Sequence, residues 1–220
     1  MERIAVKVCG LRRADEVAAA VAAGVAYLGF NFFPPSPRSI APAEAAALGA
    51  AVPPGVARVG LFVDPTDALL AATLAVAPLD IVQLHGAETP ARVAEVRARF
   101  GLPVMKAVGV ADEGDLAAVF DYSLVADQIL VDAKPPKNAD LPGGNGLSFD
   151  WRLVAQRRWL RPWMLAGGLR PDNVAEAIRL TNARQVDVSS GVESAPGVKD
   201  AARIADFVRA ATEDGPPILR

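Results

Sequence analysis

Short apolar runs rich in β-branched residues recur eight times along the chain. Each run is bounded by glycine, proline or a polar residue, which is typical of a buried β-strand. The runs cover residues 5–10, 27–33, 57–63, 81–86, 104–110, 128–133, 163–169 and 185–191. This pattern predicts eight short strands.

Alanine-rich segments with helical spacing lie between these runs. The clearest cover residues 14–25, 42–52, 65–76, 89–100, 171–180 and 198–211. Some open with a pair that is typical of a helix N-terminus, such as Thr89 before Pro90 and Asp64 before Pro65. Strands that alternate with helices predict right-handed β–α–β units and a parallel sheet.

Eight such units in 220 residues predict one α/β domain over residues 1–220, a closed (β/α)8 TIM barrel with eight parallel strands. An open doubly wound sheet is the alternative. Against it, no GxGxxG motif follows the first strand and no acidic residue is placed to hold a ribose. The longest irregular segment, residues 133–151, follows the sixth strand, and loops of that length are usually functional or mobile.

Composition narrows the classes of partner. The 25 acidic and 23 basic side chains give a net charge of -2 without a basic stripe, which argues against nucleic acid. The chain also lacks both a signal peptide's apolar core and the roughly 18 apolar residues of a membrane helix. A single cysteine cannot form an internal disulfide, so a reducing cytoplasm fits best.

Polar residues stand where the predicted strands end. An active site in such a barrel is built from the C-terminal ends of its strands, so these residues should meet at one mouth although they are far apart in sequence. They are Cys9 on the first strand, Arg38 after the second, His85 on the fourth, Asp132 on the sixth, and Asp187 and Ser190 on the eighth.

Each of these residues also has a purely structural interpretation. A lone cysteine on an apolar strand is commonly a small buried hydrophobe, and Lys7 could simply pair with Asp187 inside the barrel. Arg38 could be a solvated loop charge. Asp132 is harder to explain in this way, because a carboxylate buried without a partner costs several kcal/mol. Their coincidence at strand ends favours a site.

Two glycine-rich turns follow the last two strands. AGGL at 166–169 contains Gly168, and SSGVE at 189–193 contains Ser190 and Gly191. Glycines allow backbone N–H groups to approach an anion, and phosphate sites of these barrels commonly follow strands seven and eight. The sequence therefore predicts a phosphorylated small-molecule substrate.

Nearly end to end, the chain resembles the phosphoribosylanthranilate isomerases of tryptophan biosynthesis. The motifs that carry the resemblance include KVCGL (7–11), GFNFFPPSPR (29–38), VQLHG (82–86), LAGGLRPDNV (165–174) and DVSSGVESAPGVKD (187–200). Asn31 departs from the aliphatic residue that is usual at its position, and Asn145 departs from the usual threonine. The resemblance implies a (β/α)8 barrel and an Amadori rearrangement of N-(5′-phosphoribosyl)anthranilate, without metal or organic cofactor.

The resemblance also assigns roles. It implies that Asp132 is the general acid and Cys9 the general base. The chemistry favours a raised pKa for Asp132 and a lowered pKa for Cys9, for which Lys7 is a source of positive field. The remaining candidates contact the substrate: Arg38 the anthranilate carboxylate, Gly168, Ser190 and Gly191 the phosphate, and His85 and Asp187 the sugar hydroxyls or the acid and base. Lys106 has no assigned role.

Two other functions compete with this one. Another phosphosugar barrel enzyme, such as indole-glycerol-phosphate synthase or the histidine-pathway isomerase, is disfavoured by Cys9 and by the SPR motif that contains Arg38. A barrel that only binds a phosphorylated ligand is disfavoured because both Cys9 and Asp132 are present. The sequence leaves a monomer and a homodimer equally open.

Overall fold

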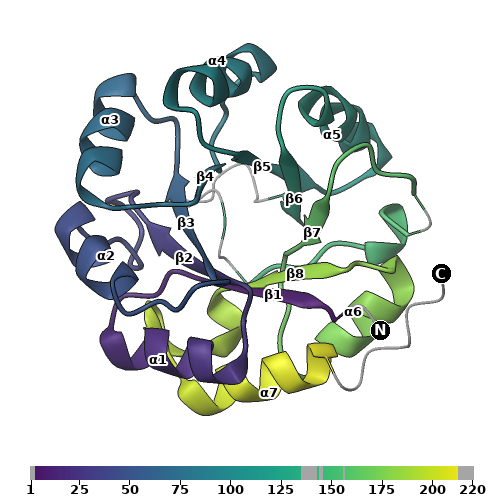
Figure 1. Cartoon of the computed structure of the whole chain (residues 1–220). Helices are drawn as coiled ribbons and strands as arrows, with labels where there is room; N and C mark the ends of the chain where they lie inside the picture. The colour runs from purple at the N-terminus through teal and green to yellow at the C-terminus, as the bar shows by residue number, and fades with distance from the viewer. Residues whose placement is uncertain (1–2, 135–142, 144–145, 156, 213–220) are drawn as a thin grey trace.

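Eight parallel strands form a closed barrel, in sequence order, with the first strand beside the last. The computed structural model describes residues 3–134, 143, 146–155 and 157–212. Figure 1 shows the strands as a ring with the helices around it. The predicted fold class is confirmed, and the open doubly wound sheet is excluded.

All eight strands lie within the predicted runs. They are Ala5–Cys9 (β1), Tyr27–Asn31 (β2), Ala57–Phe62 (β3), Ile81–Leu84 (β4), Val104–Val110 (β5), Gln128–Ala133 (β6), Trp163–Leu165 (β7) and Gln185–Val188 (β8). Several end earlier than predicted, because apolar residues and glycines continue into the loops. After β7, for example, Gly167 and Gly168 have φ of 83° and 64°, which a strand cannot contain.

Seven α-helices cover the outside of the barrel in the described part of the chain. They are Ala14–Ala23 (α1), Pro42–Gly49 (α2), Asp67–Val76 (α3), Pro90–Phe100 (α4), Leu116–Ser123 (α5), Val174–Thr181 (α6) and Ala201–Thr212 (α7). Thr89 caps α4 as predicted, since its side chain accepts a hydrogen bond from the N–H of Arg92. The prediction of Asp64 at the start of the preceding helix is wrong: Thr66 caps α3, and the Asp64 carboxylate instead accepts the N–H of Ala87.

The connection after β6 differs from the others. Residues 135–142 and 144–145 of the long segment noted above, including Asn145, lie outside the described residues. Its described end forms a short 3-10 turn, Trp151–Leu153. After β8, another 3-10 turn (Ser190–Val192) leads into a small hairpin of β9 (Glu193–Ala195) and β10 (Val198–Lys199).

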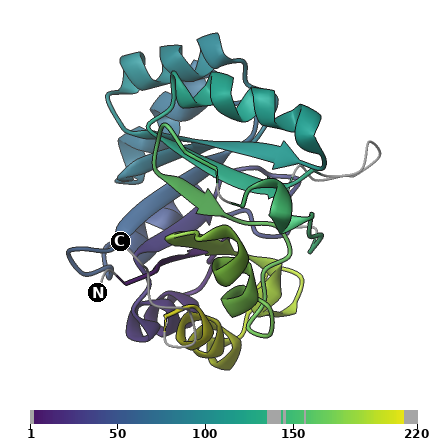
Figure 2. The same cartoon turned by 90° about the vertical axis from the view of Figure 1, so that its right-hand side faces the viewer.

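The strand period of two divides the apolar residues into two layers. On β5, Met105 and Ala107 belong to the small cluster inside the barrel, whereas Val104, Val108 and Val110 belong to the large cluster under the helices. The strands run toward one end of the molecule (Figure 2), so their C-terminal ends form one mouth. No helix in the described ranges is long and apolar enough to cross a membrane.

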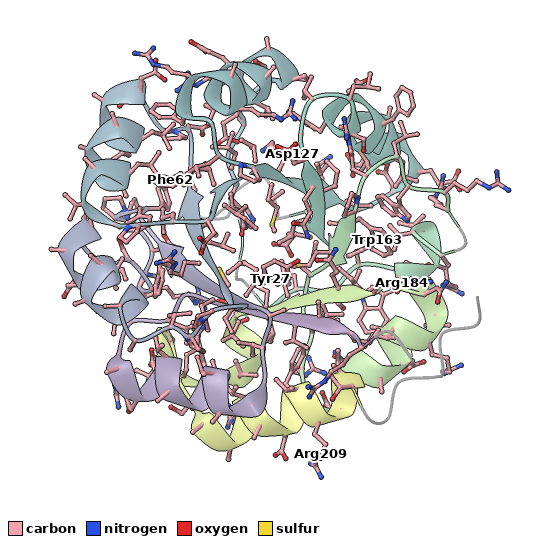
Figure 3. The ribbon with its side chains drawn as sticks, in the orientation of Figure 1. Tyr27, Phe62, Asp127, Trp163, Arg184 and Arg209 are labelled. Atoms are coloured by element: carbon pink, nitrogen blue, oxygen red, sulfur yellow. The ribbon has the colours of Figure 1, made fainter. Side chains whose placement is uncertain are left out.

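The opposite end of the barrel interior is polar. The hydroxyl of Tyr27 on β2 donates to Oε1 of Gln185 on β8 at 2.9 Å, and Nε2 of Gln128 on β6 donates to the same oxygen at 2.9 Å. Figure 3 shows Tyr27 inside the ring of strands, whereas Arg209 projects from α7 away from it. Three strands that are not adjacent are thus tied together below the mouth.

A buried ion pair joins the first and last strands. Lys7 on β1 and Asp187 on β8 are register partners, and Lys7 Nζ lies 2.9 Å from Asp187 Oδ1. Their side chains are 0% and 9% exposed. Burial alone would lower the pKa of Lys7, but the charges and hydrogen bonds of Asp187 and Cys9 together outweigh it, and the pKa is raised. The pair is therefore charged where the barrel closes, as the structural interpretation of Lys7 proposed.

Removing one member of this pair should destabilise the barrel strongly. We expect Lys7→Met to lower the free energy of unfolding by about 3–5 kcal/mol, because it leaves a buried carboxylate without its ammonium. The double variant Lys7→Met/Asp187→Asn should lose less than the sum of the single variants. Urea unfolding measures all three. The exposed pair Arg13–Asp15 is the control, and its removal should change stability far less, because solvent screens the two charges. A Lys7→Met variant as stable as the wild type would contradict the expectation.

Candidate active site

One pocket opens at the C-terminal ends of the strands, and we call it the mouth pocket. All eight site residues predicted from the sequence line it: Cys9, Arg38, His85, Asp132, Gly168, Asp187, Ser190 and Gly191. The barrel brings these residues together because they lie at or after the C-terminal ends of six parallel strands, with Asp187, Ser190 and Gly191 all from β8. Their roles remain predictions, whereas their common position is a property of the fold.

Cys9 ends β1 and is 5% exposed. Burial raises the pKa of its thiol, and the neighbouring charge of Asp187 raises it further, while the charges of Lys7 and Lys199 act to lower it. The net direction is upward. The expectation of a lowered pKa is therefore wrong, because desolvation of the thiolate outweighs the field of Lys7.

Asp132 is oriented from two sides. Its Oδ1 accepts the N–H of Ala133 at 2.8 Å, and its Oδ2 lies 3.4 Å from Nε2 of His85. The other ring nitrogen of His85 lies 3.0 Å from Nε2 of Gln83, which is fully buried on β4. The row Gln83–His85–Asp132 thus links the ends of β4 and β6, and it places His85 to orient the predicted acid.

Asn31 shapes the loop that carries Arg38. Its Oδ1 accepts the N–H of Phe33 at 2.8 Å, and its Nδ2 donates to Oγ of Ser36 at 3.3 Å. Oγ of Ser36 in turn accepts the N–H of Arg38 at 3.2 Å. The departure from an aliphatic residue at position 31 therefore gives this loop polar contacts that an aliphatic side chain could not make.

Arg38 is held by a carboxylate that the sequence did not single out. Its Nε and Nη2 donate to Oε1 and Oε2 of Glu193 at 2.7 and 2.9 Å, and both side chains are buried. Arg38 is thus not a solvated loop charge. Burial would raise the pKa of Glu193, but the hydrogen bonds and charges of Arg38 and Lys199 outweigh it, so the pKa lies below its ordinary value. Glu193 is ionised between two cations.

The two glycine turns pack against neighbouring backbone. Gly168 has φ of 64°, and a Cβ there would lie 2.8 Å from the carbonyl of Leu147. A Cβ on Gly191 would lie 1.9 Å from the carbonyl oxygen of Leu169. Only glycine fits at either position without displacing backbone. The turns after β7 and β8 therefore lie together beside the mouth pocket, as a phosphate cradle requires.

Lys106 lies outside the mouth pocket. By the period of two, its side chain points away from the barrel interior. On the outer side of β5, its Nζ contacts Glu88 Oε2 at 2.8 Å and the carbonyl of Gly86 at 2.7 Å. It also lies over the ring of Tyr122 on α5. Lys106 therefore secures the turn after β4. Among the described residues, no group of three His, Cys, Asp or Glu side chains could hold a metal ion.

The closed barrel, with one pocket at the C-terminal ends of its strands, defines the class of the protein as a (β/α)8-barrel enzyme. The comparisons identify its family. A model of the N-(5′-phosphoribosyl)anthranilate isomerase family matches residues 6–210, and the chain belongs to that family.

Named relatives and solved structures agree with this assignment. The chain is 68% identical over 216 residues to the N-(5′-phosphoribosyl)anthranilate isomerase of Paracoccus denitrificans, covering 98% of this chain and 99% of that protein. The crystal structure of the Thermotoga maritima enzyme has a TM-score of 0.85 at 36% identity, covering 94% and 98% of the two chains. An isomerase solved with reduced 1-(o-carboxyphenylamino)-1-deoxyribulose 5-phosphate has a TM-score of 0.81 at 34% identity, with the same coverage.

The thiol of Cys9 should titrate above a free cysteine. Because Cys9 is the only cysteine, the ultraviolet absorbance of its thiolate reports it alone, with Cys9→Ser as the blank. We expect a midpoint above the ordinary value of about 8.5, since burial raises the pKa. In Lys7→Met the midpoint should rise further, because a lowering charge is lost. A wild-type midpoint at or below that of a free thiol would show that the two lysines dominate.

Proposed function

We propose that this chain converts N-(5′-phosphoribosyl)anthranilate to 1-(2-carboxyphenylamino)-1-deoxyribulose 5-phosphate in tryptophan biosynthesis, with Asp132 as general acid and Cys9 as general base. The observation that carries the proposal is their position. Both line one pocket, on β6 and β1, in a member of this isomerase family. The reaction is an aldose–ketose isomerisation of the Amadori type.

The acid acts first. Asp132 in its protonated form donates to the ring oxygen of the ribose, and the ring opens to a Schiff base with the anthranilate nitrogen. The N–H of Ala133 and the ring of His85 hold the carboxyl group in a fixed direction. A fixed donor lowers the barrier because no reorientation is needed when the oxygen takes up the proton.

The base then removes the proton from C2′ of the Schiff base. Cys9 does this as the thiolate, and the resulting enolamine becomes the ketone. A raised pKa makes the thiolate a stronger base but less populated at neutral pH. Lys7 and Lys199 offset part of this loss, since both charges favour the thiolate. The activity should therefore rise with pH as the thiolate forms.

The two ends of the substrate have separate sites. The planar guanidinium of Arg38 suits the anthranilate carboxylate, and Gly168, Ser190 and Gly191 suit the phosphate. Asp187 acts through Lys7, which holds its Oδ1. The ligand in the related complex carries both a carboxyphenyl group and a phosphate, which supports this division.

We further propose that the reaction needs no metal or organic cofactor, and that the protein works in the cytoplasm as a monomer or homodimer. The acid–base chemistry needs only the two side chains named above. A single cysteine suits a reducing compartment. The related Thermotoga maritima isomerase is described as dimeric, and gel filtration of this protein distinguishes the two states.

Loss of either acid–base residue should abolish most of the turnover. We expect Cys9→Ala and Asp132→Asn each to lower kcat by about 10² or more, the usual scale of general acid–base catalysis. The assay uses phosphoribosylanthranilate generated in situ, with the wild type beside both variants. Wild-type activity with a near wild-type rate in either variant would remove that residue from the mechanism. A folded wild type without turnover would refute the function itself.

Arg38 should act mainly on binding. We expect Arg38→Ala to raise KM by about 10-fold to 100-fold with a smaller change in kcat, because two charge-assisted hydrogen bonds to the carboxylate are lost. Arg38→Lys should lie between the two, since lysine keeps the charge but not the planar fork. Steady-state kinetics separate KM from kcat. An unchanged KM in the folded Arg38→Ala variant would exclude Arg38 from the carboxylate site.

A further inference from the structure

Lys199 is a buried cation that the mechanism above uses only through its field. It lies on β10, outside the barrel strands, and its side chain is 0% exposed. Its Nζ donates to Oε1 of Glu193 at 2.7 Å and to O and Oγ of Ser189 at 3.1 and 3.2 Å. An ammonium has three hydrogens, so these three acceptors satisfy it completely.

The residues that carry these acceptors, Glu193 and Ser189, contact or adjoin three parts of the mouth pocket. Glu193 holds the guanidinium of Arg38. Ser189 directly precedes Ser190 and Gly191, and its Oγ donates to the carbonyl of Cys9 at 3.1 Å. One ammonium therefore connects the candidate carboxylate site, the candidate phosphate turn and the end of the strand that carries the base.

The backbone of Lys199 is also held in place. Its backbone N–H donates to Oε1 of Glu16 at 2.9 Å, and Oε2 of this buried carboxylate accepts the N–H of Arg12 at 2.8 Å. Glu16 lies on α1, the helix that follows β1. The short hairpin is thus anchored to the first β–α unit of the barrel, so the ammonium has little freedom to move with respect to Cys9.

The charges show what Lys199 contributes to anion binding. Nε of Arg38 and Nζ of Lys199 both contact Oε1 of Glu193, each at 2.7 Å. Two cations thus share one anion, and the three groups carry a net charge of about +1. With a neutral residue at position 199, the Arg38–Glu193 pair would have no net charge. Lys199 therefore keeps a net positive charge beside the Arg38 guanidinium.

We propose that Lys199 is a positioning residue that fixes the spacing between Arg38 and the Ser190–Gly191 turn, and thereby selects ligands with a carboxylate at one end and a phosphate at the other. The inference rests on the proposed function for the identity of that ligand. The inference extends the proposed function, because it assigns specificity for ligand length to a residue that does not line the pocket.

The same ammonium also affects the base. Its charge lowers the pKa of Cys9, together with Lys7 and against burial and Asp187. Burial lowers the pKa of Lys199 itself, and Glu193 opposes this. Loss of the Lys199 charge should therefore move the rising limb of the pH profile of kcat/KM to higher pH. A purely structural lysine would leave this limb in place.

Lys106 offers a matched control. Its ion pair with Glu88 is equally buried, at 2% exposure for both side chains, and its Nζ–Oε2 distance is 2.8 Å. As with Glu193, the Glu88 carboxylate keeps other donors when the lysine is removed, here the N–H groups of Asp64 and Gly86. Lys106→Met thus repeats the chemical change of Lys199→Met at a site outside the mouth pocket.

The experiment measures binding without turnover. Calorimetry gives the Kd of the reduced product analogue, which has both anionic ends, and of inorganic phosphate, which fills only one. We expect Lys199→Met to raise the Kd of the analogue by about tenfold or more, which corresponds to the loss of roughly one charge-assisted contact. The Kd of phosphate should rise by a smaller factor. Lys106→Met should leave both Kd values at their wild-type values. In a separate turnover assay, it should also leave the rising limb of the pH profile of kcat/KM unchanged.

Each other outcome has a defined meaning. Equal Kd values in Lys199→Met and Lys106→Met would overturn the proposal. If Lys199→Met lost affinity for the analogue and for phosphate by the same factor, a general effect of charge would account for the loss, and the proposed role in spacing would be wrong. If the methionine variants do not fold, Lys199→Gln and Lys106→Gln, which keep a hydrogen-bond donor, repeat the comparison. A wild type that binds the analogue without turnover would refute the proposed function and leave the binding test intact.

Discussion

The whole arrangement depends on closure of the barrel between β1 and β8. The sheet has to bring its first and last strands into register, and at this seam Lys7 lies opposite Asp187 with both charges buried. A buried pair of this kind adds little net stability over apolar packing, but it strongly penalises any register that separates the two charges. Because Cys9 and Ser189 follow on the same two strands, the seam that closes the barrel also places the candidate base beside the candidate phosphate turn.

The mouth of the barrel is held by buried charges, each with several partners. Glu193 joins Arg38 and Lys199, Glu88 joins Lys106 to the turn after β4, and Glu16 joins α1 to the small hairpin. A buried carboxylate is tolerated when hydrogen bonds satisfy its oxygens. The apolar cores lie inside the barrel and between the strands and the helices. The loops at the mouth lie beyond these cores, so buried charged contacts hold them in place. Rigid loops reduce the ordering cost of binding a small charged substrate.

The environment of Cys9 reflects opposing demands. Closing the pocket from water strengthens every electrostatic contact of the substrate, but it also raises the cost of the thiolate. Two lysines near Cys9 counter that cost without cancelling it. Both are neutralised by carboxylates, Lys7 by Asp187 and Lys199 by Glu193, so neither can supply its full field. The outcome is a thiol whose thiolate is strongly basic when it forms and sparsely populated at neutral pH.

The sequence by itself determined the barrel and which polar residues meet at its mouth. Runs of apolar residues fixed the eight strands, and the rule that active sites lie at C-terminal strand ends brought Cys9, Arg38, His85, Asp132 and Asp187 together correctly. The tertiary structure alone decided their partners. Glu193 meets Arg38 across 155 residues, Lys106 points outward to Glu88, and burial reverses the expected pKa shift of Cys9. Periodicity is a local property that a sequence displays directly, whereas desolvation and ion pairing depend on which distant side chains share the same small volume.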